Sequence, residues 1–140
     1  MKDLVQVRNM IYDIREQKVM VDFELAELYE VETKYLNRAV KRNIERFPSD
    51  FMFQITREEW EFLKCQIGTS KMVGETRGGR QYLPYVFTEQ GVAMLSGILR
   101  SKKAIEVNIN IMRTFVSMRQ WAIDSKEFGQ RLRDIERYFI

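Results

Sequence analysis

The stretch Tyr29-Glu-Val-Glu-Thr-Lys-Tyr-Leu-Asn-Arg-Ala-Val-Lys-Arg-Asn43 predicts a helix with one apolar and one basic face. Thr33 is expected to cap this helix, because a hydroxyl can accept from the first free backbone amides. The helix is expected to run to about Phe47, where the proline that follows disfavours helical backbone. Leu36 and Ala39 fall on one side and are expected to face the rest of the protein.

A second helix is predicted directly before this stretch. Asp22 is expected to cap it, because its carboxylate can accept from the free amides of the first turn. Leu25, Leu28 and Tyr29 follow at steps of three and four residues, which is typical of a helix with one buried face. With a short turn at Val31, the two helices have the spacing of a helix-turn-helix motif.

The basic face of the later helix carries the candidate DNA-contacting residues. Arginine and lysine can pair with guanine edges or phosphates, and asparagine can bind adenine through two hydrogen bonds. From Lys34 to Arg46 there are five basic residues and one acidic residue, a local charge of 5 − 1 = +4, whereas the whole chain carries +3. The residues expected to face DNA are Lys34, Tyr35, Asn37, Arg38, Lys41 and Arg42.

A solvated helix face is the alternative interpretation of this pattern, because basic amphipathic helices also occur in proteins that bind no DNA. Residues 22–32 hold five acidic residues and no basic one. These acids are expected to be solvated or to cap helices. The earlier helix is therefore not expected to lie flat on phosphates; only its N-terminus or the later helix could approach them.

Short strands and further helices are expected around this pair. A hairpin is expected over 5–21 and a strand over 51–56. Thr56 and Glu59 have the spacing of a capping box, which predicts the start of another helix. Residues 68–80 contain four glycines and no apolar periodicity, so they are expected to form a loop.

That loop holds the second candidate contact, Arg77 and Arg80. A flexible basic tip beside a strand can touch phosphates or enter a minor groove. An ordinary connector with solvated charges remains the alternative.

After the loop, a strand is expected over 81–87, with Pro84 indicating an edge position. Thr88 is expected to cap a helix that runs to about Leu99. Gly91, in its first turn, is expected to allow close packing against a neighbour.

A long helix is expected from about Lys102 to Ile123. Its apolar residues cover more than one face, which indicates a place in the core or in an oligomer. The tail then has apolar residues at heptad spacing, namely Phe128, Leu132, Ile135 and Phe139. The expected architecture is α+β: a helix-turn-helix-like pair with short strands, followed by a long C-terminal helix able to mediate dimerisation.

Several motifs of the chain resemble the ORF6N domain, a family related to the KilA-N and Bro-N modules of phages and large DNA viruses. The match covers about residues 8–120, with the motifs in order. The resemblance implies a DNA-binding module of phages, prophages and their bacterial hosts, often joined to variable C-terminal segments. We therefore expect an ORF6N-like domain over 1–123 and the start of a helical or coiled-coil extension over 124–140. The motifs are Ile14-Arg-Glu-Gln-Lys-Val-Met20, Leu25-Ala-Glu-Leu-Tyr-Glu-Val31, Asn43-Ile-Glu-Arg-Phe-Pro-Ser-Asp-Phe-Met-Phe53, Gly79-Arg-Gln-Tyr-Leu-Pro-Tyr-Val-Phe-Thr-Glu-Gln-Gly-Val-Ala-Met-Leu-Ser96 and Ile109-Asn-Ile-Met-Arg-Thr-Phe-Val-Ser-Met-Arg119.

The composition argues against several other classes of protein. The chain has no histidine and a single cysteine, Cys65, so it cannot assemble a Cys/His zinc site and lacks the commonest general base. The acidic residues do not suggest the converging carboxylates of a metal-dependent nuclease. We expect no enzyme activity, cofactor, metal or small-molecule substrate.

The charges near the start of the chain argue against a signal peptide, and no window is long and apolar enough for a membrane span. The expected location is the cytoplasm. The expected partner is double-stranded DNA, bound by a homodimer formed through the C-terminal helices. The alternative is a protein-interaction module, similar to an antirepressor, that acts on a regulator without touching DNA.

Overall fold

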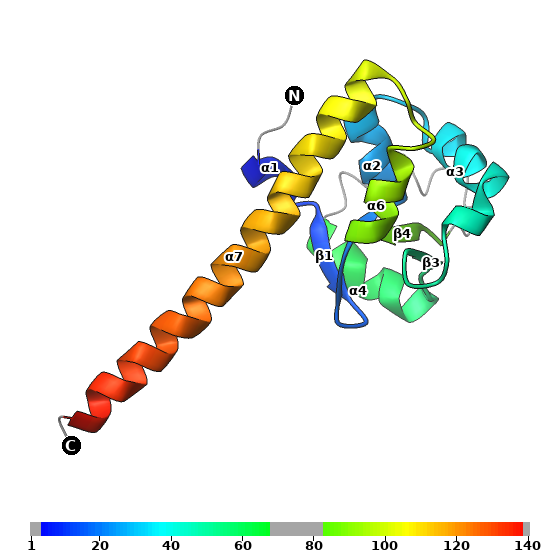
Figure 1. The fold of residues 1–140 in the computed structure, drawn as a ribbon. Coiled ribbons are helices and arrows are strands. Elements are labelled where there is room, and N and C mark those ends of the chain that lie inside the picture. The colour runs from blue at the N-terminus through cyan, green and yellow to red at the C-terminus, as the bar shows by residue number, and fades with distance from the viewer. Residues whose placement is uncertain (1–3, 68–82, 139–140) are drawn as a thin grey trace.

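The structure is a computed structural model, which describes residues 4–67 and 83–138 of the chain. Short strands and helices form a globular part, from which the end of one long helix projects (Figure 1). The fold is α+β, as the sequence predicted. In chain order the elements are α1 (Leu4–Arg8), β1 (Ile11–Ile14), β2 (Gln17–Val21), α2 (Asp22–Tyr29), α3 (Thr33–Arg42), the 3₁₀ helix η1 (Ile44–Arg46), β3 (Met52–Gln54), α4 (Arg57–Ile67), β4 (Tyr85–Thr88), α6 (Glu89–Leu95) and α7 (Lys102–Tyr138).

The four strands form one sheet in the order β1-β2-β4-β3, with antiparallel neighbours. Phe87 of β4 lies between Met20 of β2 and Met52 of β3 in the register. The prediction that Pro84 marks an edge strand is therefore wrong, because β4 is an inner strand. Pro84 directly precedes the strand, so its missing amide removes no ladder bond, and its carbonyl accepts from Ile55 N at 3.2 Å.

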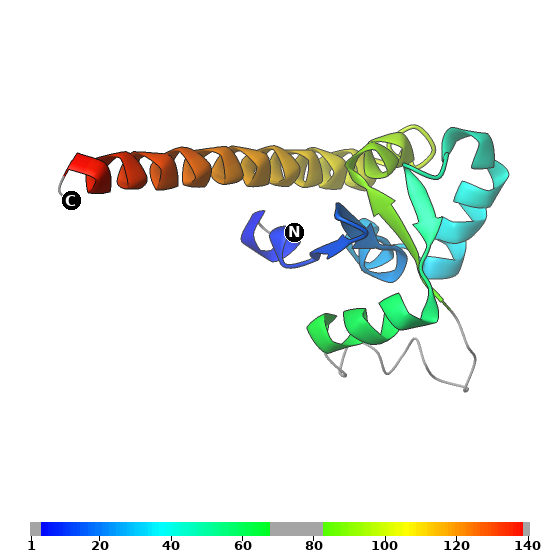
Figure 2. The ribbon, with the colours of Figure 1, turned by 90° about the horizontal axis from the view of Figure 1, so that it is seen from below.

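The sheet separates two apolar clusters, because successive side chains along a strand point to opposite faces. Met20 and Phe87 belong to the larger cluster, which includes buried residues of α1, α2, α3, α6 and α7. Val19, Val21 and Val86 belong to the smaller cluster, which α4 covers. Figure 2 shows α7 and α4 on opposite sides of the sheet. Helices α2 and α3 thus contribute to the same apolar cluster as α7.

The hairpin is shorter than predicted and begins at Ile11 rather than near residue 5. The segment before it forms α1, whose Val7 packs into the larger cluster, and Met10, in the turn after the helix, joins the same cluster. Arg15 and Glu16 make the two-residue turn of the hairpin with φ values of 54° and 62°. Both residues occupy the left-handed region, which ordinarily favours glycine or asparagine.

Two predicted helix caps are confirmed. Thr56 N donates to Glu59 Oε1 at 2.8 Å, and Glu59 N donates to Thr56 Oγ1 at 3.2 Å, which completes the capping box. Thr88 Oγ1 accepts from Gly91 N at 3.4 Å at the start of α6. The helix that Thr88 starts ends at Leu95, earlier than predicted.

The other two predicted caps are wrong. The N-cap positions of α2 and α3 are Val21 and Glu32, and neither side chain makes a capping hydrogen bond. Asp22 lies inside the first turn of α2, and Thr33 is the first residue of α3. The predicted helix up to residue 47 also ends earlier, at Arg42, and its remainder is the 3₁₀ helix η1.

Helix α7 runs from Lys102 to Tyr138 as one element, so the long helix and the heptad tail predicted separately are continuous. Its first part packs against α1, α2 and α6, and its second part extends away from the globular part (Figures 1 and 2). None of the described helices combines the length and apolarity needed to cross a membrane.

Candidate nucleic-acid interface

Helix α3 packs through a small apolar face against α2. Leu36, Ala39 and Val40 are buried on this face, at 0%, 5% and 3% exposure. Ala26 and Ala39 both belong to the larger cluster, as expected for two helices in close contact. The prediction that Leu36 and Ala39 face the rest of the protein is therefore confirmed.

A short left-handed turn joins the two helices. Glu30 has φ 60°, and Val31 N donates to Ala26 O at 3.0 Å, which closes the end of α2. Val31, which lies in the predicted turn, is partly buried against the larger cluster. The turn directs α3 across the edge of the globular part.

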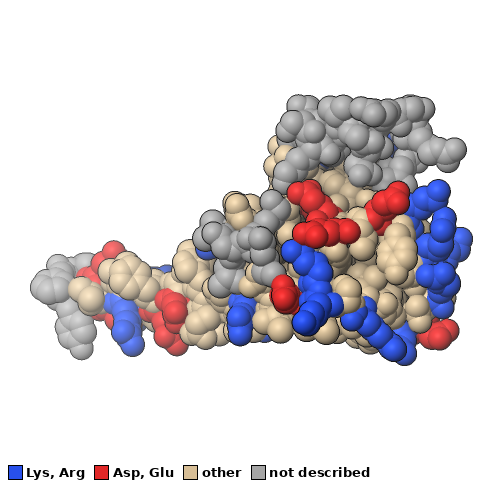
Figure 3. Space-filling model, turned by 90° about the horizontal axis from the view of Figure 1, so that it is seen from above, with Lys and Arg blue, Asp and Glu red and all other residues tan. Residues whose placement is uncertain are grey.

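The opposite face of α3 is basic and exposed. The exposed cations from α3 and η1 are Lys34, Arg38, Lys41, Arg42 and Arg46. None of these five side chains makes an ion pair with any residue that the structure describes. Tyr35 lies beside them and is 49% exposed. Figure 3 shows Lys and Arg side chains gathered along the edge of the globular part where α3 lies, on the right of the view.

Arg46 of η1, already named, and Arg100, which follows α6, extend this surface beyond α3. An added Cβ at Gly97, in the turn after α6, would lie 3.4 Å from Arg46 Nη1. Arg100 Nε donates to Gly97 O at 3.1 Å, so Arg46 and Arg100 flank the same turn. Both are exposed. Neither arginine was among the predicted DNA contacts. For Arg100 the sequence signal was the basic run Arg100-Ser-Lys-Lys103, but only the tertiary fold places this run beside α3.

Asn37 points to the interior rather than to solvent. Its Nδ2 donates to Asp22 Oδ2 at 2.9 Å, and the same oxygen accepts from Tyr85 N at 3.2 Å. Asp22 is completely buried. One carboxylate thus connects the middle of α3 to the inner strand β4. The prediction that Asn37 contacts DNA stays untested, but the amide has a structural partner here.

The acidic residues of 22–32 are not all solvated, contrary to the prediction. Asp22 and Glu24 are fully buried, and Tyr12 Oη donates to Glu24 Oε1 at 2.7 Å. Burial raises the pKa of the Tyr12 hydroxyl, and its hydrogen bond to Glu24 raises it further, so the hydroxyl remains a donor. Two of the five acids therefore present no charge to a partner at the surface.

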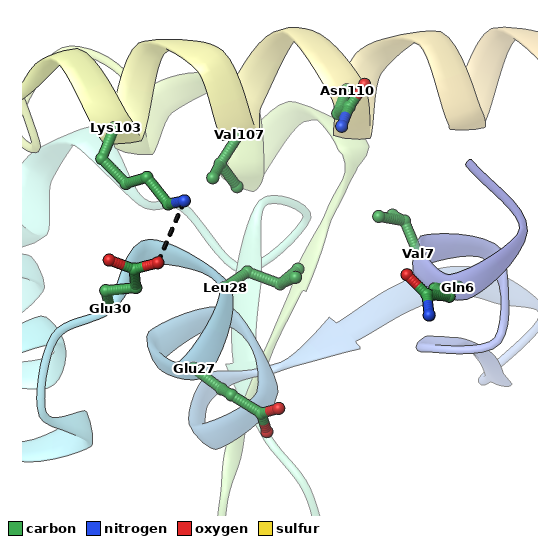
Figure 4. A pocket seen from close by; sticks show the side chains of 8 residues that line it. All are labelled: Gln6, Val7, Glu27, Leu28, Glu30, Lys103, Val107 and Asn110. Atoms are coloured by element: carbon green, nitrogen blue, oxygen red, sulfur yellow. Dashed lines mark ion pairs between the residues drawn. The ribbon is translucent and has the colours of Figure 1, made fainter. Parts of the chain in front are cut away.

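One of the exposed acids of this segment pairs with α7. Lys103 Nζ lies 3.0 Å from Glu30 Oε2 and links the start of α7 to the end of α2 (Figure 4). This pair borders a pocket of about 350 Å³ whose lining also includes Gln6, Val107 and Asn110. The repulsion that Glu30 would exert on a nearby phosphate is reduced by the adjacent ammonium.

The remaining residues named in the sequence analysis are Arg77, Arg80 and Cys65. Arg77 and Arg80 lie outside the described residues, as does the rest of the predicted 68–80 loop. Cys65 is exposed on α4, and its Sγ donates to Glu61 O at 3.7 Å. Within residues 4–67 and 83–138, no cluster of three or more potential metal ligands is present.

Comparison with known proteins gives one match. The model of the ORF6N domain family matches residues 9–98, which is more than half of the chain, and the chain belongs to this family. This membership indicates a regulatory protein of the phage type. The match ends just before Arg100, so α7 lies outside it. No curated protein and no solved structure matches the chain.

Proposed function

We propose that this chain binds duplex DNA through the exposed basic face of α3. The observation that carries the proposal is that all five cations of α3 and η1 are exposed and make no ion pair with a described residue. Charged side chains that are not paired within the described part of the chain are available to phosphates and base edges. Membership of the ORF6N family supports the same function.

The dimensions of the site agree with this proposal. A single α-helix fits the major groove of B-DNA, where base edges differ in their hydrogen-bonding patterns. Lys34, Arg38 and Lys41 lie at helical spacing on one side of α3, opposite its buried residues. Arg46 and Arg100 lie at the end of this face, where they would meet the phosphate backbone.

The test is binding of fluorescently labelled random-sequence duplexes, measured by anisotropy at several salt concentrations. The variant is Arg38→Ala with Lys41→Ala. The matched control is Lys126→Ala with Arg133→Ala, which removes the same two charges from the exposed second part of α7. If both α3 side chains contact phosphates, the slope of log K against log salt falls by about two. The control should keep the slope of the unchanged protein.

Equal slopes for the two double variants would contradict the proposal, because net charge rather than the α3 surface would then determine binding. Thermal unfolding of the α3 variant should be nearly unchanged, since exposed charges contribute little to stability. An equal loss of stability and binding would assign these residues to the fold instead.

A second candidate function is a protein-interaction module that acts on a regulator without DNA contact. The exposed apolar side chains of α7 favour it, including Ile105, Ile109 and Val116, which are 46–54% exposed. Binding through such surfaces would be insensitive to salt, whereas binding to DNA weakens steeply as salt rises. A protein with no measurable affinity for duplexes at low salt would support this candidate over the first.

A further inference from the structure

One face of α7 changes from buried to bare along its length. Positions at alternating steps of three and four residues form a single heptad stripe from 104 to 135. The first four residues of the stripe are buried in the globular part, namely Ala104, Val107, Ile111 and Thr114. Met118 is half-buried, and the exposed remainder consists of Trp121, Ser125, Phe128, Leu132 and Ile135.

The exposed half of the stripe begins at Trp121, where the Arg8 guanidinium lies 5.9 Å from the centre of the indole ring, and continues along the part of α7 that projects from the globular part (Figure 2). Of the side chains described from 121 to 137, all are exposed except at Gly129. Phe128 is 64% exposed, Leu132 45% and Ile135 53%. In proteins most of the stability of a helix comes from packing of its apolar face rather than from helix propensity. A covering partner is therefore expected.

We propose that a second copy of this chain covers the bare stripe, with the two α7 helices antiparallel. Volume matching favours this arrangement, because large residues should face small ones in a packed seam. The small Ser125 then lies opposite the partner's Phe128. On either side of this layer, Trp121 lies opposite the partner's Leu132, and Met118 opposite the partner's Ile135. A parallel pair in register would instead place Ser125 against the partner's Ser125 and Trp121 against the partner's Trp121.

Charges beside the stripe fit the antiparallel arrangement. Asp124 and Arg131 occupy equivalent heptad positions on one flank, and both are exposed without an ion pair to a described residue. In the antiparallel pair these flanks face each other, so Asp124 meets the partner's Arg131. Two-fold symmetry gives a second, identical contact between Arg131 and the partner's Asp124, on the other side of the Ser125–Phe128 layer. A parallel pair would instead bring Arg131 near the partner's Glu136, which is also an attractive contact. The charges therefore permit both orientations, and the matched side-chain volumes favour the antiparallel one.

The stoichiometry of the protein in solution tests the proposal without any DNA, so its outcome is independent of the proposed function. Sedimentation velocity should show a dimer that dissociates on dilution. Ile135→Gln should raise the dissociation constant about 100-fold, since two symmetry-related side chains leave the seam and each contributes about a factor of ten. The matched control is Ile123→Gln, which removes the same residue type at nearly equal exposure, 51% against 53%, from a position off the stripe.

The control variant should dimerise like the unchanged chain. A monomer over about a hundredfold range of concentration would overturn the proposal, and so would equal effects of the two substitutions. Far-UV circular dichroism of each variant at a concentration where it is monomeric separates a loss of dimerisation from a loss of the globular fold.

Charge reversal tests the orientation. Asp124→Arg and Arg131→Asp should each weaken the dimer, and the double variant should restore it, because both antiparallel pairs are then attractive with exchanged signs. In a parallel dimer the double variant would remain weak, since the new carboxylate at position 131 would approach the partner's Glu136. Failure of the double variant to restore dimerisation would overturn the antiparallel arrangement.

Discussion

Gly91→Ala should destabilise the fold strongly, because the first turn of α6 lies directly on the backbone before β3. A Cβ on Gly91 would fall 2.0 Å from Phe51 O and 3.0 Å from Phe51 C. Backbone atoms cannot move aside as a flexible side chain can, so one segment must shift. Overpacking costs about 1–3 kcal/mol or more. The shift also strains the hydrogen bonds that Thr88 N and Thr88 Oγ1 donate to Phe51 O, at 3.0 and 3.2 Å, each worth about 1 kcal/mol.

Alanine recovers about 1 kcal/mol of helix propensity over glycine, so the net loss is about 2–4 kcal/mol. For a chain of this size that lowers the melting temperature by roughly 10 °C. Thermal and urea denaturation followed by circular dichroism measure it. The matched control is Gly129→Ala in α7, where the nearest atom to an added Cβ is Arg133 Nη1 at 3.7 Å. The control should be neutral or stabilised. A Gly91→Ala protein as stable as the control would refute the reasoning.

Three further substitutions test other contacts. Asn37→Ala should lower stability by about 1–3 kcal/mol, seen as a lower urea midpoint, because it removes a hydrogen bond from the buried Asp22; an unchanged midpoint would contradict the structural role. Glu16→Gly should stabilise the protein by about 0.5–1 kcal/mol in the same assay. Glycine adopts the left-handed turn without strain, and this gain exceeds the cost of the greater flexibility that glycine gives the unfolded chain. A loss of stability there would show that the turn is not strained. The Arg15 guanidinium, whose Nε donates to Glu59 Oε2 at 2.7 Å, lowers the pKa of that carboxyl from its ordinary value. The stability that the ionised Glu59 contributes is complete above the pKa of this carboxyl in the unfolded chain. It is lost as the pH falls through the lower pKa of the folded protein. Arg15→Met should therefore reduce the fall in melting temperature on acidification.

Helix faces and two of the four caps could be predicted from the sequence because they depend on local spacing. The inward residues of α3 and the capping box at Thr56 follow from three- and four-residue steps. The single buried face expected for α2 is not observed, because all residues of α2 except Glu27 are buried. Whether a strand lies at the edge or inside the sheet could not be predicted from local spacing. Pro84 suggested an edge because proline lacks a ladder donor, but that argument fails one residue before a strand, where no donor is needed.

The caps assigned to Asp22 and Thr33 failed for a different reason. Asp22 has the side chain of an N-cap, but Asn37 and Tyr85, 15 and 63 residues further along, occupy its carboxylate. Tertiary hydrogen bonds thus replaced a local one. The same limit applies to the candidate interface: the exposure of Arg38 follows from helical periodicity, whereas the position of Arg100 beside Arg46 requires the folded chain.

Because Asp22 fastens the centre of α3 to the inner strand, the backbone of that helix is set in place during folding rather than on contact with a partner. A surface prepared in advance loses little conformational freedom on association. Any mismatch in shape then has to be absorbed by the ligand. For a double helix, sequences that bend or widen their grooves easily would be preferred, even at base pairs that no side chain touches.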